Sequence, residues 1–109
     1  MKKQPSECSS LQDIRDEIDA IDHEITFALG RRLEYVKAAS AFKPNLESIP
    51  APERVAAMLP QRRLWAEQAG LEPDFFENIF SQLIQWFINE QVRFYRSKQK
   101  KVNGNEKPD

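Results

Sequence analysis

A single run of apolar residues, repeating every three or four positions, constrains the fold of this chain more than any other feature. Its members are Leu11, Ile14, Ile18, Ile21, Ile25, Ala28, Leu29, Leu33, Val36 and Ala39. Ser10 and Asp13 open the run with the spacing of a helix N-cap and an acidic first-turn residue. Pro44 disfavours helical geometry at Lys43, so we expect the helix to end there. This predicts one helix of about thirty residues, roughly 45 Å long at 1.5 Å per residue.

The next segment, residues 44–52, reads PNLESIPAP and has the proline content of a loop. Pro52 is suited to the first position of a second helix, which we expect to reach about Gln68. Gly70 then provides a C-terminal stop. Pro60 lies inside this span and is expected to kink the helix or to split it.

A third apolar repeat, rich in aromatic residues, begins near Pro73 and fades after Arg96. Its apolar positions are Phe76, Ile79, Phe80, Leu83, Ile84, Phe87, Ile88, Val92 and Tyr95. No segment alternates with period two in the manner of a strand, so the predicted class is all-α, with three helices. We expect one helical domain over residues 1–97 and a polar, disordered tail over residues 98–109.

Composition excludes several classes of protein. The chain has 109 residues and is 40% hydrophobic, enough for one domain with a modest core. Sixteen Lys and Arg against seventeen Asp and Glu give a net charge of −1, which predicts neither nucleic acid nor a membrane as partner. One cysteine and one histidine argue against a disulfide scaffold and a typical zinc site. Without an apolar leader, a cytoplasmic protein that uses no metal is the expectation.

The length of the first helix also bears on the oligomeric state. Two shorter helices of the same chain cannot cover its apolar stripe unless they run along all of it. Pairing with a second copy solves this more simply, which predicts an intertwined homodimer. A monomeric three-helix bundle is the alternative.

Several polar residues stand on these apolar faces without an oppositely charged residue three or four positions away. They are Arg32, Arg54, Arg62 and Gln91, whereas Arg15 has an acidic residue at i+4. A desolvated cation is costly unless an anion meets it, so such residues need a partner from another helix or a bound ligand. Ordinary contacts between helices explain each of them equally well.

The order and spacing of several segments match a known family. From Ile14 the chain reads IRDEIDAIDHEI, followed by Arg32, by VKAASAFK ending at Lys43, and later by Gln91. This pattern resembles the all-helical chorismate mutases. The segments GRRLEYVKAASAFK, IPAPERVAAMLPQRRLWAE and IQWFINEQVRFYR resemble more specifically the isochorismate pyruvate lyases, the salicylate-forming branch of that superfamily. The resemblance runs from about Cys8 to Arg96.

The resemblance implies an intertwined, all-helical homodimer that needs no cofactor and converts isochorismate to salicylate and pyruvate. By position, Arg15 and Arg32 would bind the two substrate carboxylates, with Arg15 supplied by the partner subunit. Lys43 and Gln91 would lie near the ether oxygen whose bond breaks. Arg54 would be a further substrate contact near the loop, and we expect that loop to order over bound ligand.

Two other functions stay open. The first is a chorismate mutase forming prephenate, although this chain departs from the mutases at two positions. It has Val55 where they often carry a glutamate for the ring hydroxyl, and Phe87 where they carry a small hydroxyl residue. The second is a non-catalytic dimerisation module, in which Arg15, Arg32 and Gln91 only set the pairing register.

Overall fold

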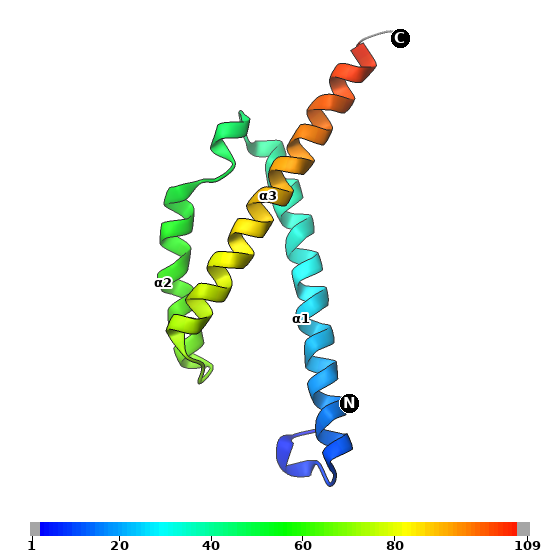
Figure 1. Ribbon diagram of the computed structural model, residues 1–109, viewed down its shortest axis with the longest axis vertical. Helices are drawn as coiled ribbons and strands as arrows, with labels where there is room; N and C mark the ends of the chain where they lie inside the picture. The colour runs from blue at the N-terminus through cyan, green and yellow to red at the C-terminus, as the bar shows by residue number, and fades with distance from the viewer. Residues whose placement is uncertain (1–2, 107–109) are drawn as a thin grey trace. The chain divides into compact units, whose positions relative to one another are not determined.

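The computed structural model describes the backbone of residues 3–106 and the side chains of residues 3–100. Within this range the chain forms three α-helices and three short 3-10 turns, joined by short connections (Figure 1). In chain order these elements are η1 (Pro5–Glu7), α1 (Leu11–Ala39), η2 (Ser40–Phe42), η3 (Leu46–Ser48), α2 (Pro52–Gln68) and α3 (Pro73–Glu106). The predicted all-α class with three helices is confirmed.

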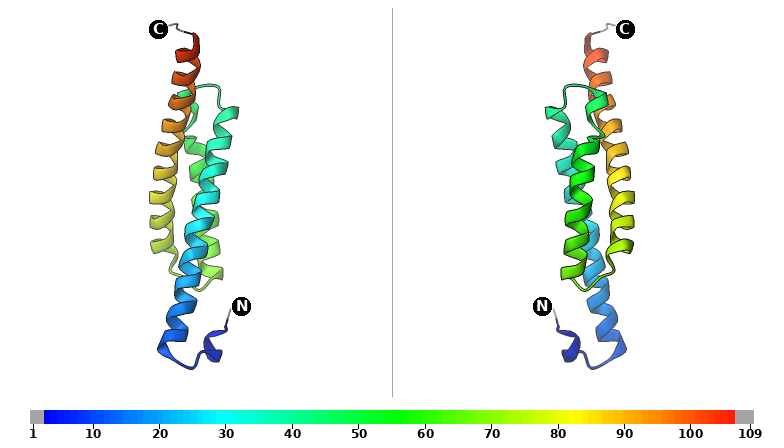
Figure 2. Two further views of the ribbon diagram at one scale, coloured as in Figure 1. Left: turned by 90° about the vertical axis from the view of Figure 1, so that its right-hand side faces the viewer. Right: turned by 90° about the vertical axis from the view of Figure 1, so that its left-hand side faces the viewer.

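The chain divides into two units, Met1–Tyr35 and Val36–Asp109. In the second unit α2 and α3 run antiparallel and pack against each other, as the views in Figures 1 and 2 agree. The buried apolar residues all belong to this unit and are Ile49, Met58, Ala66, Ile84 and Phe87. In the first unit, by contrast, none of the described residues is buried.

The start of α1 is fixed by reciprocal hydrogen bonds. The backbone N–H of Asp13 donates to the Ser10 hydroxyl oxygen at 3.0 Å, which confirms Ser10 as the N-cap. In return, the Ser9 backbone N–H and hydroxyl both donate to the Asp13 carboxylate at 3.0 Å. The backbone bond from Ser9 is the main reason that the pKa of Asp13 lies below its ordinary value.

The end of α1 differs from the prediction. The α-helix stops at Ala39, and η2 occupies the residues that were expected to continue it to Lys43. Lys43 is extended, with φ −93° and ψ 124°, as the residue before a proline prefers. The proline therefore acts as predicted, but the last turn before it tightens into a 3-10 turn.

Helix α2 begins at Pro52 and is followed by Gly70 in the left-handed region, with φ 77°, and both features were predicted. Pro60 does not split the helix, which continues through it. A proline removes one backbone donor from a helix. Met58 and Ala66 are buried on either side of it, so packing offsets the loss.

Helix α3 is longer than the sequence indicated. A disordered tail was expected from residue 98, whereas α3 is helical to Glu106; residues 107–109 lie outside the described range. Extending an existing helix costs little, because each added residue fixes one conformation and gains one hydrogen bond. The division into a domain over residues 1–97 and a separate tail stays a prediction.

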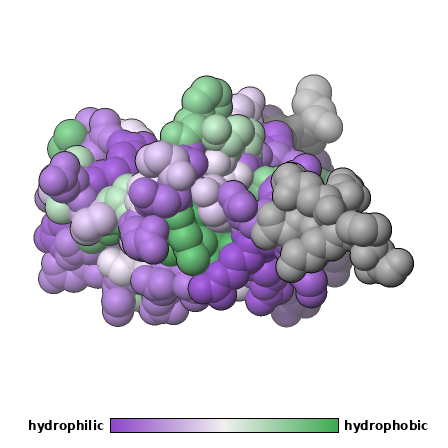
Figure 3. All heavy atoms as spheres, turned by 90° about the horizontal axis from the view of Figure 1, so that it is seen from above, coloured by the Kyte–Doolittle hydropathy of each residue, from purple (hydrophilic) through white to green (hydrophobic). Residues whose placement is uncertain are grey.

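Large apolar side chains are exposed in both units, and Figure 3 shows hydrophobic residues at the surface among hydrophilic ones. In Met1–Tyr35 they are Leu11, Ile14, Ile18, Ile21, Ile25, Phe27 and Tyr35. None of the helices in the described part of the chain has an apolar stretch that would carry it across a membrane.

Candidate active site

Gln91 is the most enclosed of the five predicted site residues. It lies on α3 with 6% of its surface exposed. Its Nε2 donates a hydrogen bond to the backbone carbonyl oxygen of Val36, near the end of α1, at 2.9 Å. A buried polar side chain is stable only when it is hydrogen-bonded, and this contact meets that need. One of the two amide N–H groups is thereby used.

Lys43 follows η2 directly and is half-buried. Its Nζ donates to the backbone carbonyl oxygen of Ser48, the last residue of η3, at 3.3 Å. The ammonium group is thus tied to the loop of residues 44–52, of which Ile49 is 2% exposed and anchors the loop in the core. Lys43 and Gln91 bind different backbone carbonyls, and neither side chain donates a hydrogen bond to the other.

Arg54 lies exposed in the first turn of α2, and Arg62 lies further along the same helix. The Arg62 guanidinium stacks over the ring of Trp65 at 4.8 Å and lies 5.9 Å from the ring of Phe80. Its Nε is buried and has no hydrogen-bond partner among the described residues. Burial, and then the positive charge of Arg54, lower the pKa of Arg62. Two positive charges therefore influence each other on α2.

The remaining two predicted residues belong to the other unit. Arg15 is exposed and Arg32 is half-buried, and both lie on α1. Their separation along the helix axis is about 25 Å at 1.5 Å per residue. One copy of α1 therefore cannot bring both guanidinium groups to the same small molecule.

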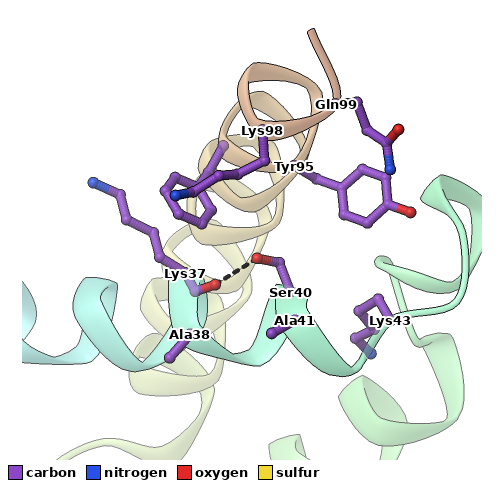
Figure 4. A pocket seen from close by; sticks show the side chains of 9 residues that line it. Lys37, Ala38, Ser40, Ala41, Lys43, Tyr95, Lys98 and Gln99 are labelled. Carbon is purple, nitrogen blue, oxygen red and sulfur yellow. Dashed lines mark hydrogen bonds between the residues drawn. The ribbon is translucent and has the colours of Figure 1, made fainter. Parts of the chain in front are cut away.

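A cavity of about 500 Å³ adjoins Lys43 in the second unit (Figure 4). It is lined by the end of α1, by η2 and by the C-terminal part of α3, through Lys37, Ala38, Ser40, Ala41, Lys43, Phe94, Tyr95, Lys98 and Gln99. Sequence reasoning did not find this group. It assigned Lys98 to the tail, and no local spacing shows that Lys37 and Lys98 approach the same ring, that of Phe94.

The all-helical fold of the described residues agrees with the class of protein to which the chain is similar. The chain belongs to the type II chorismate mutase family, whose model matches residues 14–92. It is 56% identical to the isochorismate pyruvate lyase of Pseudomonas aeruginosa over 94 residues, which are 86% of this chain and 93% of that protein.

More distant relatives share only one part of a longer protein. The chain is 38% identical over 78 residues to the T-protein of Haemophilus influenzae and 35% identical over 78 residues to that of Enterobacter agglomerans. The matched regions are 70% and 71% of this chain but only 20% and 21% of those proteins.

Proposed function

We propose that this chain is an isochorismate pyruvate lyase, which cleaves isochorismate to salicylate and pyruvate, with weak chorismate mutase activity as a side reaction. The observation that carries the proposal is the 56% identity to a protein of that name, over nearly the full length of both chains. The T-proteins are matched over only 20% and 21% of their length, so they do not support the proposal in the same way. The proposed place of action is the cytoplasm.

The proposed active form is a homodimer. The residues Leu11, Ile14, Ile18, Ile21 and Ile25 form one stripe on α1, and each of them is between 43% and 60% exposed. Burial of a fully exposed side chain of this kind contributes roughly 1.5–3 kcal/mol, and about half of that remains to be gained at each position, so a second copy covering the stripe would be favoured. Antiparallel pairing would also place Arg15 of one chain near Arg32 of the other, which the 25 Å separation along one helix does not allow.

Binding is assigned to the arginines. The substrate carries two carboxylates, and a guanidinium group binds a carboxylate through two parallel hydrogen bonds that fix its angle as well as its position. Arg32 and the partner subunit's Arg15 would hold the two carboxylates, and Arg54 would add a contact beside the loop. Such clamping selects a compact substrate conformer, which is the orientation contribution to rate.

The bond changes need no nucleophile. The C–O bond to the enolpyruvyl group breaks while a ring hydrogen moves to the methylene carbon of that group, which leaves an aromatic ring and pyruvate. Negative charge develops on the departing oxygen. A fixed donor there stabilises the transition state by about 3–4 kcal/mol, and we assign this role to the Lys43 ammonium and the second N–H of Gln91. Both side chains retain donors beyond those bound to Ser48 and Val36.

Chorismate mutase as the main activity is the second candidate, because the family model carries that description. Phe87, where the mutases carry a small hydroxyl residue, is 3% exposed and belongs to the apolar core. A phenylalanine has no hydroxyl group that could bind a substrate. Val55 likewise offers no carboxylate for the ring hydroxyl of chorismate.

One assay separates the candidates. The purified protein, in EDTA, is given isochorismate and chorismate in separate reactions, and salicylate is followed by its fluorescence and prephenate by its conversion to phenylpyruvate in acid. We expect rapid salicylate from isochorismate and slow prephenate from chorismate. Faster prephenate formation would establish the mutase instead, and the absence of both products would leave the non-catalytic dimerisation module.

A further inference from the structure

The cavity beside Lys43 has the size and the charge of a binding site for a small anion. Its volume of about 500 Å³ lies within the range of sites that hold small molecules. Three of its lining residues are lysines, and none is Asp or Glu. Cationic side chains that share a concave surface without acids repel one another, and an anion between them relieves that repulsion.

Two of the lysines approach the same aromatic ring. The Nζ of Lys37, from α1, lies 5.7 Å from the centre of the Phe94 ring, and the Nζ of Lys98, from α3, lies 5.4 Å from it. Attraction of each ammonium to the ring orients side chains that are otherwise flexible. Figure 4 shows Lys37 and Lys98 on the same side of the cavity. Both ammonium groups therefore lie within 6 Å of the centre of the same ring.

The other side of the cavity carries neutral hydrogen-bonding groups. The Tyr95 hydroxyl and the Gln99 amide lie there, away from Lys37 and Lys98 (Figure 4). Ser40 is occupied within the protein, because its hydroxyl donates to the backbone carbonyl oxygen of Lys37. A phenol and a primary amide can each donate and accept, so they suit a hydroxyl or a ketone on the ligand.

We propose that this cavity binds a small hydroxycarboxylate or oxocarboxylate. The carboxylate lies between Lys37 and Lys98, and the hydroxyl or keto oxygen meets Tyr95 and Gln99. None of the arginines assigned to the substrate is among the residues that line this cavity. The Nζ of Lys43, which does line it, is bound to the carbonyl oxygen of Ser48. The class of ligand follows from the cavity itself. Only the choice of salicylate and pyruvate, the products of the proposed reaction, rests on the proposed function.

The test is an equilibrium titration of isotope-labelled, full-length protein, followed by backbone amide signals. Salicylate and pyruvate are added in separate titrations, and benzoate serves as the matched carboxylate without a hydroxyl or keto group. We expect at least one of the two products to shift the signals of Tyr95 and Gln99. If only one of the two products shifts these signals, that product is the one that the cavity holds. Failure of both to shift these signals would overturn the proposal.

Variants then assign the contacts. The double variant Lys37→Gln/Lys98→Gln should weaken binding roughly tenfold or more, because charge-assisted hydrogen bonds are lost. Lys100→Gln, on an exposed residue that does not line the cavity, should leave binding unchanged. Tyr95→Phe should bring the affinity for the bound product close to that for benzoate. An unchanged affinity in the double variant, with circular dichroism confirming its helical content, would contradict the assignment.

Two further measurements keep this inference distinct from the proposed function. In Arg32→Gln the shifts at Tyr95 and Gln99 should persist, since they do not depend on the substrate arginines. Their loss would place the ligand in the catalytic site instead. Turnover of isochorismate by the wild-type protein is measured separately. If the protein lacks turnover but binds the ligand through Lys37 and Lys98, the proposed function is refuted and the cavity site is supported. If the protein turns over isochorismate but does not bind the ligand through these lysines, only the cavity site is refuted.

Discussion

The side-chain amide of Gln91 donates to the backbone carbonyl oxygen of Val36 at 2.9 Å, across a separation of 55 positions in the sequence. This bond joins α3 to the last turns of α1 in the interior of the Val36–Asp109 unit. It holds the amide that we assign to the departing oxygen in one orientation. Structure and proposed catalysis therefore depend on the same side chain.

Replacing Gln91 by leucine should lower the free energy of unfolding by about 1–3 kcal/mol, because the buried carbonyl of Val36 loses its partner. Lyase turnover should fall as well. Urea unfolding and steady-state kinetics measure the two effects. Gln82→Leu, at an exposed position of α3, is the matched control and should change stability by no more than about 0.5 kcal/mol. Equal effects of both variants would contradict a specific role for the Gln91 bond.

Lys43→Ala should lose turnover far more than substrate binding, because the ammonium is assigned to charge that develops only in the transition state. A decrease in kcat of about 10²- to 10³-fold is expected from the removal of one such donor. Arg32→Ala should instead raise KM and lower kcat together, since its carboxylate contact is present in both the ground state and the transition state. Small and equal effects of the two substitutions on kcat would argue against these roles.

Ile18→Asp/Ile21→Asp should produce a monomer with little lyase activity. Both side chains are about half exposed on α1, and two carboxylates on the stripe would oppose its burial by a second copy. Sedimentation equilibrium and the lyase assay measure the outcome. Asp16→Lys, which lies on the opposite face of the same helix at 100° per residue, should stay dimeric and active. A fully active monomer would refute both the dimer and the supply of Arg15 by the partner subunit.

Asp13 should make stability depend on acid pH. Its pKa is lowered in the folded chain, chiefly by the hydrogen bond from the Ser9 backbone N–H, from an ordinary value of 3.8. The stabilisation is therefore complete above that value and is lost as the pH falls through the lower pKa of the folded chain. Urea unfolding between about pH 2 and pH 6 should show a smaller acid loss for Asp13→Asn than for wild type. Asp16→Asn serves as the control, and an identical acid loss in wild type and Asp13→Asn would contradict this assignment.

Local sequence signals predicted the elements well wherever one residue acts on its near neighbours. Ser10 caps the start of α1, Pro52 begins α2 and Gly70 follows the end of α2, because caps, proline and left-handed glycine act within a single turn of chain. At Pro60, where the local signal predicted a kink or a split, α2 does not split, and Met58 and Ala66 are buried on either side of the proline. Helix α3 continues beyond Arg96, where the apolar repeat fades.

In the candidate site, too, the residues could be predicted from the sequence, whereas their contacts could not. The sequence selected Arg32, Lys43 and Gln91 through polar residues on apolar faces and through the motif of a family, and both are readable along the chain. It could not show that Gln91 binds Val36 or that Lys43 binds Ser48.

Periodicity, capping and motif spacing act over short stretches of chain, so the helices, the family and the residue types available for an anionic substrate could be predicted from the order of the residues. Which of those residues meet depends on how the helices pack. The clearest case is the approach of Lys37 and Lys98 to the Phe94 ring, which depends on how the end of α1 packs beside α3. Contacts between residues far apart in the chain follow from packing, and packing leaves no periodic signal in either segment alone.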